Sequence, residues 1–166
     1  MRMELIQPFI NAADAVFAES LQGPTSIGDL AMEEEAYRRK GIAALIAIKG
    51  DIEGRVILDL SPEVAARVAA KLTGGEVGDS EQTIRETVCE LANMVIGNAV
   101  TQLNDRGFQF KVFPPSLLTA EQCEKAGHDS EATILCFETP SGNVYLNIAM
   151  KYHARRSRER APITVG

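Results

Sequence analysis

Two acids, an amide and a glycine recur at helical spacing in the middle of the chain: Glu86, Glu90, Asn93 and Gly97. At about 100° per residue, these positions fall within one stripe roughly 60° wide. No Lys or Arg interrupts the segment 86–105. A glycine costs a helix about 1 kcal/mol relative to alanine. Gly97 therefore indicates that something outside the helix must approach its backbone.

The simpler interpretation of this stripe is a solvated helix face, because acidic and amide residues are common at exposed positions. Two carboxylates and one amide, with no histidine nearby in sequence, do not make a metal site. We therefore predict no metal in this chain. Cys89 lies on the flank of the same helix, and no His/Arg constellation accompanies it. A buried structural thiol is its predicted role, and a catalytic nucleophile is not.

The stripe requires a long helix, which the periodicity predicts over residues 79–105. Asp79 and Gln82 match a capping box at its start, and Gly107 closes it. The face opposite the stripe is apolar at positions that point to a core: Ile84, Val88, Leu91 and Val95.

Two further helices are predicted. One spans residues 8–21, with Pro8 at the first helical position, where its missing N–H costs nothing. The other starts at Pro62 after an N-cap at Ser61 and ends at Gly74-Gly75.

Strands account for most of the remaining sequence. Two hairpins are predicted, because in each case two apolar runs lie on either side of turn residues. The first joins residues 42–48 to 54–60, and the second joins 132–138 to 143–150. Shorter candidates follow the long helix at 108–113 and 116–119, residues 29–40 form an edge strand or loop, and residues 120–131 form an exposed loop. This order predicts an α+β fold: a mainly antiparallel sheet built from hairpins, with long helices packed on one face.

Composition and charge limit the number of domains and the classes of function that the chain can have. The chain has 166 residues, is 45% hydrophobic and carries a net charge of −6, and we expect one domain over 1–150. Residues 151–166 hold five Lys/Arg and one Glu and form a basic tail. The acidic body argues against nucleic-acid binding, and no apolar run is long enough for a membrane span. Three cysteines in scattered contexts and a start that does not read as a signal peptide favour the cytoplasm.

The run from Glu90 through Asn93 to Ala99 resembles the ExxN helix of the CheX/CheC/FliY family of chemotaxis phosphatases, and most closely its CheX branch. Similar segments precede and follow it: the opening PFINAADAVF, the first hairpin from Gly50, and the Pro114-Pro115-Ser116 step. The resemblance covers roughly residues 3–150. One ExxN is visible, as in the single-site CheX form, and Glu86 stands where the family often has Asp or Ser.

The resemblance implies that the chain hydrolyses the aspartyl-phosphate of a CheY-type response regulator, and that the regulator itself holds Mg²⁺ while this chain binds no cofactor. Asn93 would orient the water, and Glu90 would pair with a lysine of the regulator. Glu86 and Gly97 would contact the partner. The alternative is a non-catalytic module that binds a response regulator or a flagellar-switch component through the same helix.

The resemblance also implies a homodimer formed through the sheet. Sheet edges pair readily with other strands, and the β-rich segments 30–60 and 132–150 are the predicted source of such an edge.

Overall fold

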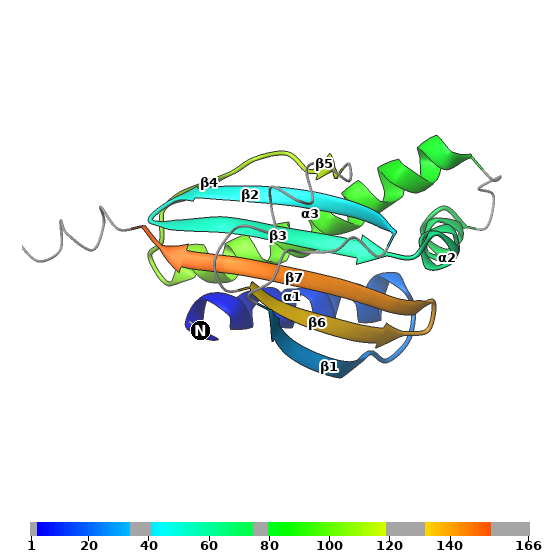
Figure 1. Cartoon of the computed structure of the whole chain (residues 1–166), viewed down its shortest axis with the longest axis horizontal. Coiled ribbons are helices and arrows are strands. Elements are labelled where there is room, and N and C mark those ends of the chain that lie inside the picture. Colours follow the sequence, from blue (N-terminus) through cyan, green and yellow to red (C-terminus); the bar gives the residue numbers. More distant parts are fainter. Residues whose placement is uncertain (1–2, 34–40, 75–79, 119–131, 154–166) are drawn as a thin grey trace, which may run out of the picture.

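The computed structural model describes residues 3–33, 41–74, 80–118 and 132–153. In these ranges the chain forms three helices and seven strands (Figure 1). The helices are α1 (Met3–Ser20), α2 (Pro62–Leu72) and α3 (Glu81–Asp105). The strands are β1 (Ser26–Glu33), β2 (Ile42–Gly50), β3 (Ile52–Leu60), β4 (Phe110–Val112), β5 (Ser116–Leu117), β6 (Ala132–Thr139) and β7 (Gly142–Tyr152).

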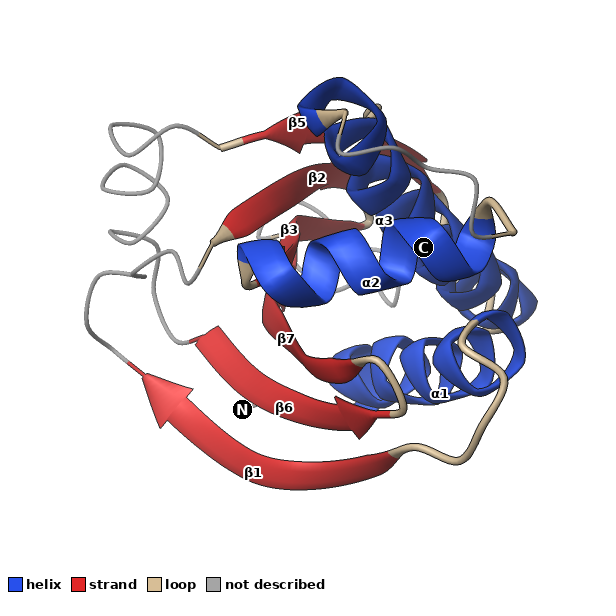
Figure 2. Cartoon of the chain, turned by 90° about the vertical axis from the view of Figure 1, so that its right-hand side faces the viewer, coloured by secondary structure: helices blue, strands red, loops and turns tan. Residues whose placement is uncertain are grey.

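The strands form one antiparallel sheet in the order β1-β6-β7-β3-β2-β4, and β5 also pairs with β2. Both predicted hairpins are present, β2 with β3 and β6 with β7. All three helices lie on the same side of this sheet (Figure 2). The predicted α+β fold, with helices on one face, is confirmed.

The main core lies between the helices and the sheet. Alternate residues of the central strands point into it and are fully or almost fully buried, among them Leu58 and Leu146. Phe17 of α1 meets Phe137 of β6 edge-on, with ring centroids 5.3 Å apart and planes at 81°. Such edge-to-face contacts add to the area that the rings bury. The helices are thus fixed to the sheet by the side chains opposite their exposed faces.

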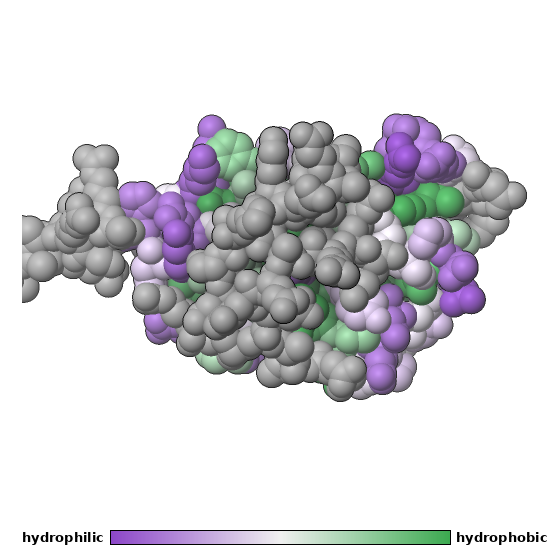
Figure 3. Space-filling model, in the orientation of Figure 1, coloured by the Kyte–Doolittle hydropathy of each residue, from purple (hydrophilic) through white to green (hydrophobic). Residues whose placement is uncertain are grey.

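The other side of the sheet carries a smaller apolar cluster of Ala43, Ile57 and Leu118. Beside it the buried Arg55 donates to the Asn147 Oδ1 at 2.8 Å across strands β3 and β7. Figure 3 looks onto this side, where hydrophilic described residues gather toward both ends of the long axis. Most of α3 lies behind the sheet in that view.

The edges of the sheet differ from the predicted ones. Among the described strands β1 pairs with β6 alone, so the start of the segment 29–40 is an edge strand, while residues 34–40 lie outside the described ranges. The segment 132–150 supplies no edge, because β6 lies between β1 and β7, and β7 lies between β6 and β3. That part of the prediction is wrong: the second hairpin is the interior of the sheet.

Two other strand predictions are too long. β4 and β5 hold three and two residues, since Pro114 and Pro115 between them cannot donate to a strand ladder. The predicted loop 120–131 and residues 154–166 of the predicted tail lie outside the described ranges, and β7 continues to Tyr152, past residue 150.

Helix α1 begins earlier than predicted, and Pro8 lies inside it rather than at its first position. A proline inside a helix leaves the carbonyl four residues earlier without its usual donor. Here that carbonyl belongs to Glu4, and the Arg106 guanidinium donates to it at 2.7 Å. A residue at the far end of α3 therefore makes the interior proline tolerable.

The ends of the other helices follow the predicted chemistry with one exception. Ser61 caps α2 by accepting from the Val64 N–H, as predicted. At the start of α3 the cap is Ser80, whose hydroxyl accepts from the Thr83 N–H at 3.4 Å. The predicted capping box of Asp79 with Gln82 is therefore wrong, because Ser80 is the cap and Asp79 lies outside the described residues. Gly107, with φ of 89°, follows the end of α3 in the left-handed region that glycine favours.

Candidate functional site

Helix α3 presents its predicted stripe to solvent. Glu86, Glu90, Asn93 and Gly97 are all exposed. The opposite face is buried from the second turn onward, and Ile84 in the first turn is partly buried. The buried residues are Thr87, Val88, Leu91, Ala92, Val95, Ile96, Ala99 and Leu103. The predicted amphipathic arrangement is confirmed, and the four candidate residues do lie together on one helix face.

Contacts at both ends and along the sides hold α3 in place. It packs against α1, α2 and β2, Ser80 caps its start, and the Phe108 N–H returns to the Leu103 carbonyl after its end. The Arg106 guanidinium ties its last turn to α1. Side chains on such a supported helix are held in place before a partner arrives.

The polar side chains of the stripe differ in how they are engaged. The Gln82 Nε2 donates to the Glu86 Oε1 at 2.9 Å, one turn earlier on the same face. Neither the Glu90 carboxylate nor the Asn93 amide has a hydrogen-bond partner within the described residues. Since the positions are three apart, the two side chains are neighbours, with Cβ atoms about 5–6 Å apart by helix geometry. The pair can therefore bind an outside group together.

Gly97 has no packing reason to be glycine. A Cβ added there would meet nothing within 4 Å, whereas one at Gly54 would meet the Ala149 carbonyl oxygen at 1.9 Å. Gly97 lies inside the continuous helix α3, and the Thr101 Oγ1 donates to its carbonyl at 3.2 Å. The bare backbone at Gly97 is thus open to a partner.

Cys89 lies on the flank of α3, half-buried against the core. Burial raises the pKa of the Cys89 thiol from its ordinary value of 9.0. A thiol with a raised pKa is a poor nucleophile at neutral pH. This environment agrees with the predicted structural role.

The described residues contain no group of three or more His, Cys, Asp or Glu side chains that could hold a metal ion. His153 instead lies 3.7 Å from Glu53, at the end of β7 and away from the stripe. No helix in the described ranges is both long and apolar enough to cross a bilayer.

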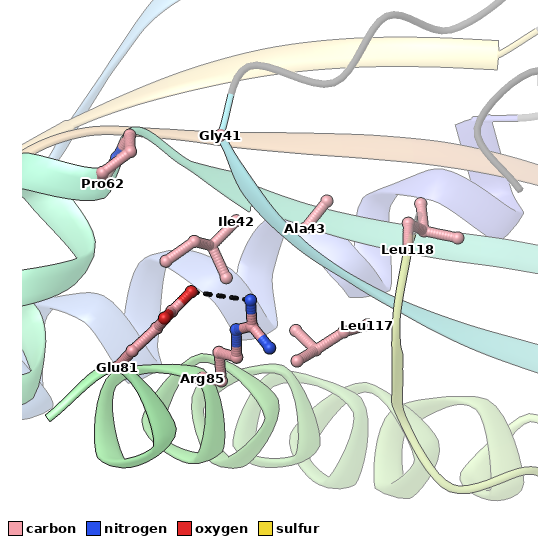
Figure 4. A pocket seen from close by; sticks show the side chains of 8 residues that line it. All are labelled: Gly41, Ile42, Ala43, Pro62, Glu81, Arg85, Leu117 and Leu118. Carbon is pink, nitrogen blue, oxygen red and sulfur yellow. Dashed lines mark hydrogen bonds and ion pairs between the residues drawn. The ribbon is translucent and has the colours of Figure 1, made fainter. Parts of the chain in front are cut away.

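A surface cavity of about 420 Å³ opens on another side of α3, near its first turns (Figure 4). The Arg85 Nη2 donates to the Glu81 Oε1 at 2.7 Å beside it. The rest of its lining is apolar or backbone, from Gly41, Ile42, Ala43, Pro62, Leu117 and Leu118. None of the four candidate residues lines this cavity.

One residue of the exposed face was missed by the sequence interpretation. Met94 is 38% exposed, unusual for a large apolar side chain, and it follows Asn93 directly. Its helical position, about 80° from Glu86 and 40° from Glu90, was the available signal. Counting only polar types along the stripe passed over it.

Comparison with known proteins places the chain in a family. Residues 42–138, which include the whole stripe, match the family model described as "Chemotaxis phosphatase CheX". The chain is also 29% identical over 79 residues to the CheY-P phosphatase CheX of Thermotoga maritima, a match that covers 47% of this chain and about half, 51%, of that relative.

Two solved structures agree in fold. CheX in its complex with CheY, BeF3 and Mg from Borrelia burgdorferi is 31% identical with a TM-score of 0.73, covering 90% of this chain and 99% of that one. A CheC-like superfamily protein from Shewanella has a TM-score of 0.76 at 21% identity, covering 91% and 99%. The second likeness shows the fold alone. With the family model matched over more than half of the sequence, the chain belongs to the CheX family of chemotaxis phosphatases.

Proposed function

We propose that this chain hydrolyses the aspartyl-phosphate of a CheY-type response regulator, with α3 as the surface that meets the regulator. The observation that carries the proposal is the exposed pair of Glu90 and Asn93, unengaged within the described residues and held on a supported helix. A regulator of this class would place the chain in the cytoplasm.

Hydrolysis of an aspartyl-phosphate requires few catalytic groups from the phosphatase. An acyl phosphate is already activated, so its hydrolysis needs a water placed in line and stabilisation of developing charge. The side-chain amide of Asn93 can accept a hydrogen bond from water and donate one to a phosphoryl oxygen. It needs no ionisation and no metal of its own. In this proposal Asn93 orients the water.

Glu90 lies one turn earlier on the same face and is the second residue of the proposed catalytic pair, to which it supplies charge. Its carboxylate would pair with a lysine in the regulator's active site, a charge-assisted contact that fixes how the two proteins align. The Mg²⁺ would belong to the regulator, and no cofactor is assigned to this chain.

Glu86 and Gly97 extend the contact on either side. Glu86, steadied by Gln82, lengthens the acidic surface toward the partner. Gly97 lets the partner approach the helix backbone. A homodimer through the sheet stays part of the proposal, with the described β1 edge as its available strand.

The test is the decay of a phosphorylated CheY-type regulator from the same genome, with and without this protein. We expect the wild type to shorten the lifetime of the phosphoryl group. Asn93→Ala should lower the added rate by roughly 100-fold, as removing one oriented polar group does in other enzymes.

Asn104→Ala is the matched control, because Asn104 is an exposed amide on the same helix but about three turns beyond Asn93. It should retain the wild-type rate. Wild-type turnover by Asn93→Ala would refute the role of Asn93. Tight binding of the regulator without acceleration by the wild type would instead support the non-catalytic binding module.

A further inference from the structure

Met94 is an exposed apolar side chain in the middle of an otherwise polar helix face. It is 38% exposed and lies one turn from Glu90 on α3. Met3 at 41% and Ile27 at 47% are the other exposed large apolar residues among those whose burial is described, and neither is on this helix. Exposed apolar side chains are unremarkable when scattered, so the neighbours of Met94 decide what it means.

Those neighbours leave Met94 accessible from one side. The residue one turn later is Gly97, which has no side chain, and a Cβ there would meet nothing within 4 Å. Glu90 borders Met94 one turn earlier and Asn98 borders it one turn later; both are exposed, and the Glu90 carboxylate has no partner in the described part of the chain. The result is one apolar side chain beside bare helix backbone, bordered by polar groups. Binding surfaces commonly place an apolar anchor inside a polar rim in this way.

The charges around Met94 indicate what could cover it. Glu86 and Glu90 are exposed, and the segment 86–105 contains no Lys or Arg. A complementary surface would carry a cation facing the carboxylates and an apolar group beside it. In the proposed function this cation would be the regulator lysine that pairs with Glu90, as the family resemblance implies.

We propose that Met94 is the apolar anchor of this complex, packing against an apolar side chain of the response regulator next to its phosphorylation site. This proposal takes the identity of the partner, a response regulator, from the proposed function. Met94 sets affinity, whereas Asn93 sets the rate of hydrolysis. Methionine suits the position because its unbranched, polarisable side chain adapts to the surface it meets.

The test separates affinity from rate. The probe is the CheY-type regulator loaded with beryllofluoride and Mg²⁺, and the dissociation constant is measured for wild type, Met94→Ala and Met94→Leu. Met94→Ala should weaken binding about fivefold, as expected when part of one apolar side chain is no longer buried. Met94→Leu should stay within about twofold, because its volume and polarity are similar. In turnover assays Met94→Ala should raise KM with a much smaller change in kcat.

Met3→Ala is the matched control, since Met3 is equally exposed but lies at the start of α1. It should bind like the wild type. The thermal unfolding midpoints of the three variants should agree with the wild type, because both methionines are exposed.

The outcomes separate this proposal from the one it rests on. Wild-type affinity in Met94→Ala, or a fall in its kcat at unchanged KM, would overturn the anchor while acceleration by the wild type still supports the phosphatase. If the wild type binds without accelerating decay, the phosphatase fails, and weakened binding by Met94→Ala still supports the anchor. If the wild type binds no regulator, both fail.

Discussion

The Arg106 guanidinium donates to the backbone carbonyl of Glu4 at 2.7 Å, and this carbonyl is the acceptor that Pro8 leaves unused inside α1. The bond joins the first turn of α1 to the residue that ends α3. It has a structural consequence for the site, because α1 is one of the elements against which the candidate helix packs.

Arg106→Ala should lower the free energy of unfolding by about 1 kcal/mol, the usual net value of one hydrogen bond. Pro8→Ala would return an N–H to the Glu4 carbonyl, so the same Arg106 change should cost less in that background. A double-mutant cycle by chemical denaturation measures this coupling. Arg85→Ala is the control: its pair with Glu81 is solvent-exposed and should be worth under about 0.5 kcal/mol. Equal costs of Arg106→Ala in both backgrounds would contradict the link.

This bond also shows where sequence reasoning stops. Proline is most common at the first helical position, so a start at Pro8 was the natural prediction. The residue that changes the outcome is Arg106, which is 102 positions from Glu4 in the chain. No local pattern reveals a donor at that distance. The same holds for β1, whose place at the edge follows from pairing with β6, as in Ser26 opposite Glu138.

Features that depend on residues close together in the sequence were predicted more accurately. The two hairpins were predicted because turn residues and alternating apolar residues lie next to each other in sequence. The exposed face of α3 was predicted because helical periodicity depends only on residues within the helix. Met94 was missed for a different reason: its helical position next to Glu90 was a signal in the sequence, but only the polar residues of that face were counted.

The thiol of Cys89 should be unreactive in the folded protein. Its pKa is raised by burial, so at pH 8 it should react with iodoacetamide more slowly than the same thiol in the unfolded chain. Peptide-level mass spectrometry gives both rates. Cys89→Ala should leave regulator dephosphorylation intact, and a large loss would contradict the structural role of this residue.

The same shift has a pH consequence. A raised folded pKa means that the neutral thiol is favoured by folding. Its contribution to stability is full below the ordinary value of 9.0 and is lost as pH rises through the folded pKa. Denaturation of the wild type should therefore become easier above pH 9, and Cys89→Ala should lack this part of the decline. Parallel pH curves for the two proteins would count against it.

Glu90 should act on affinity through its charge. Glu90→Gln keeps the shape of the side chain and should weaken regulator binding roughly two- to fivefold at low salt, the range of an exposed ion pair. Added salt should weaken wild-type binding more steeply than binding by this variant. Titrations at two ionic strengths measure both effects.

Glu63→Gln makes the same charge change on α2 and serves as the control. It should leave affinity and salt dependence as in the wild type. If both variants lose affinity equally, the effect belongs to net charge and the pairing of Glu90 with a lysine is refuted.

Gly97 should show a conflict between stability and binding. Because a Cβ there meets nothing within 4 Å and the backbone is helical, Gly97→Ala should raise the free energy of unfolding by roughly 0.5–1 kcal/mol. If a partner approaches the bare backbone, the same methyl group should weaken regulator binding, and Gly97→Leu should weaken it further. Gly107→Ala is the contrasting case, since its φ of 89° makes a side chain costly, so it should destabilise the fold. A Gly97→Ala protein that is more stable and binds the regulator as tightly as the wild type would show that the glycine serves no contact.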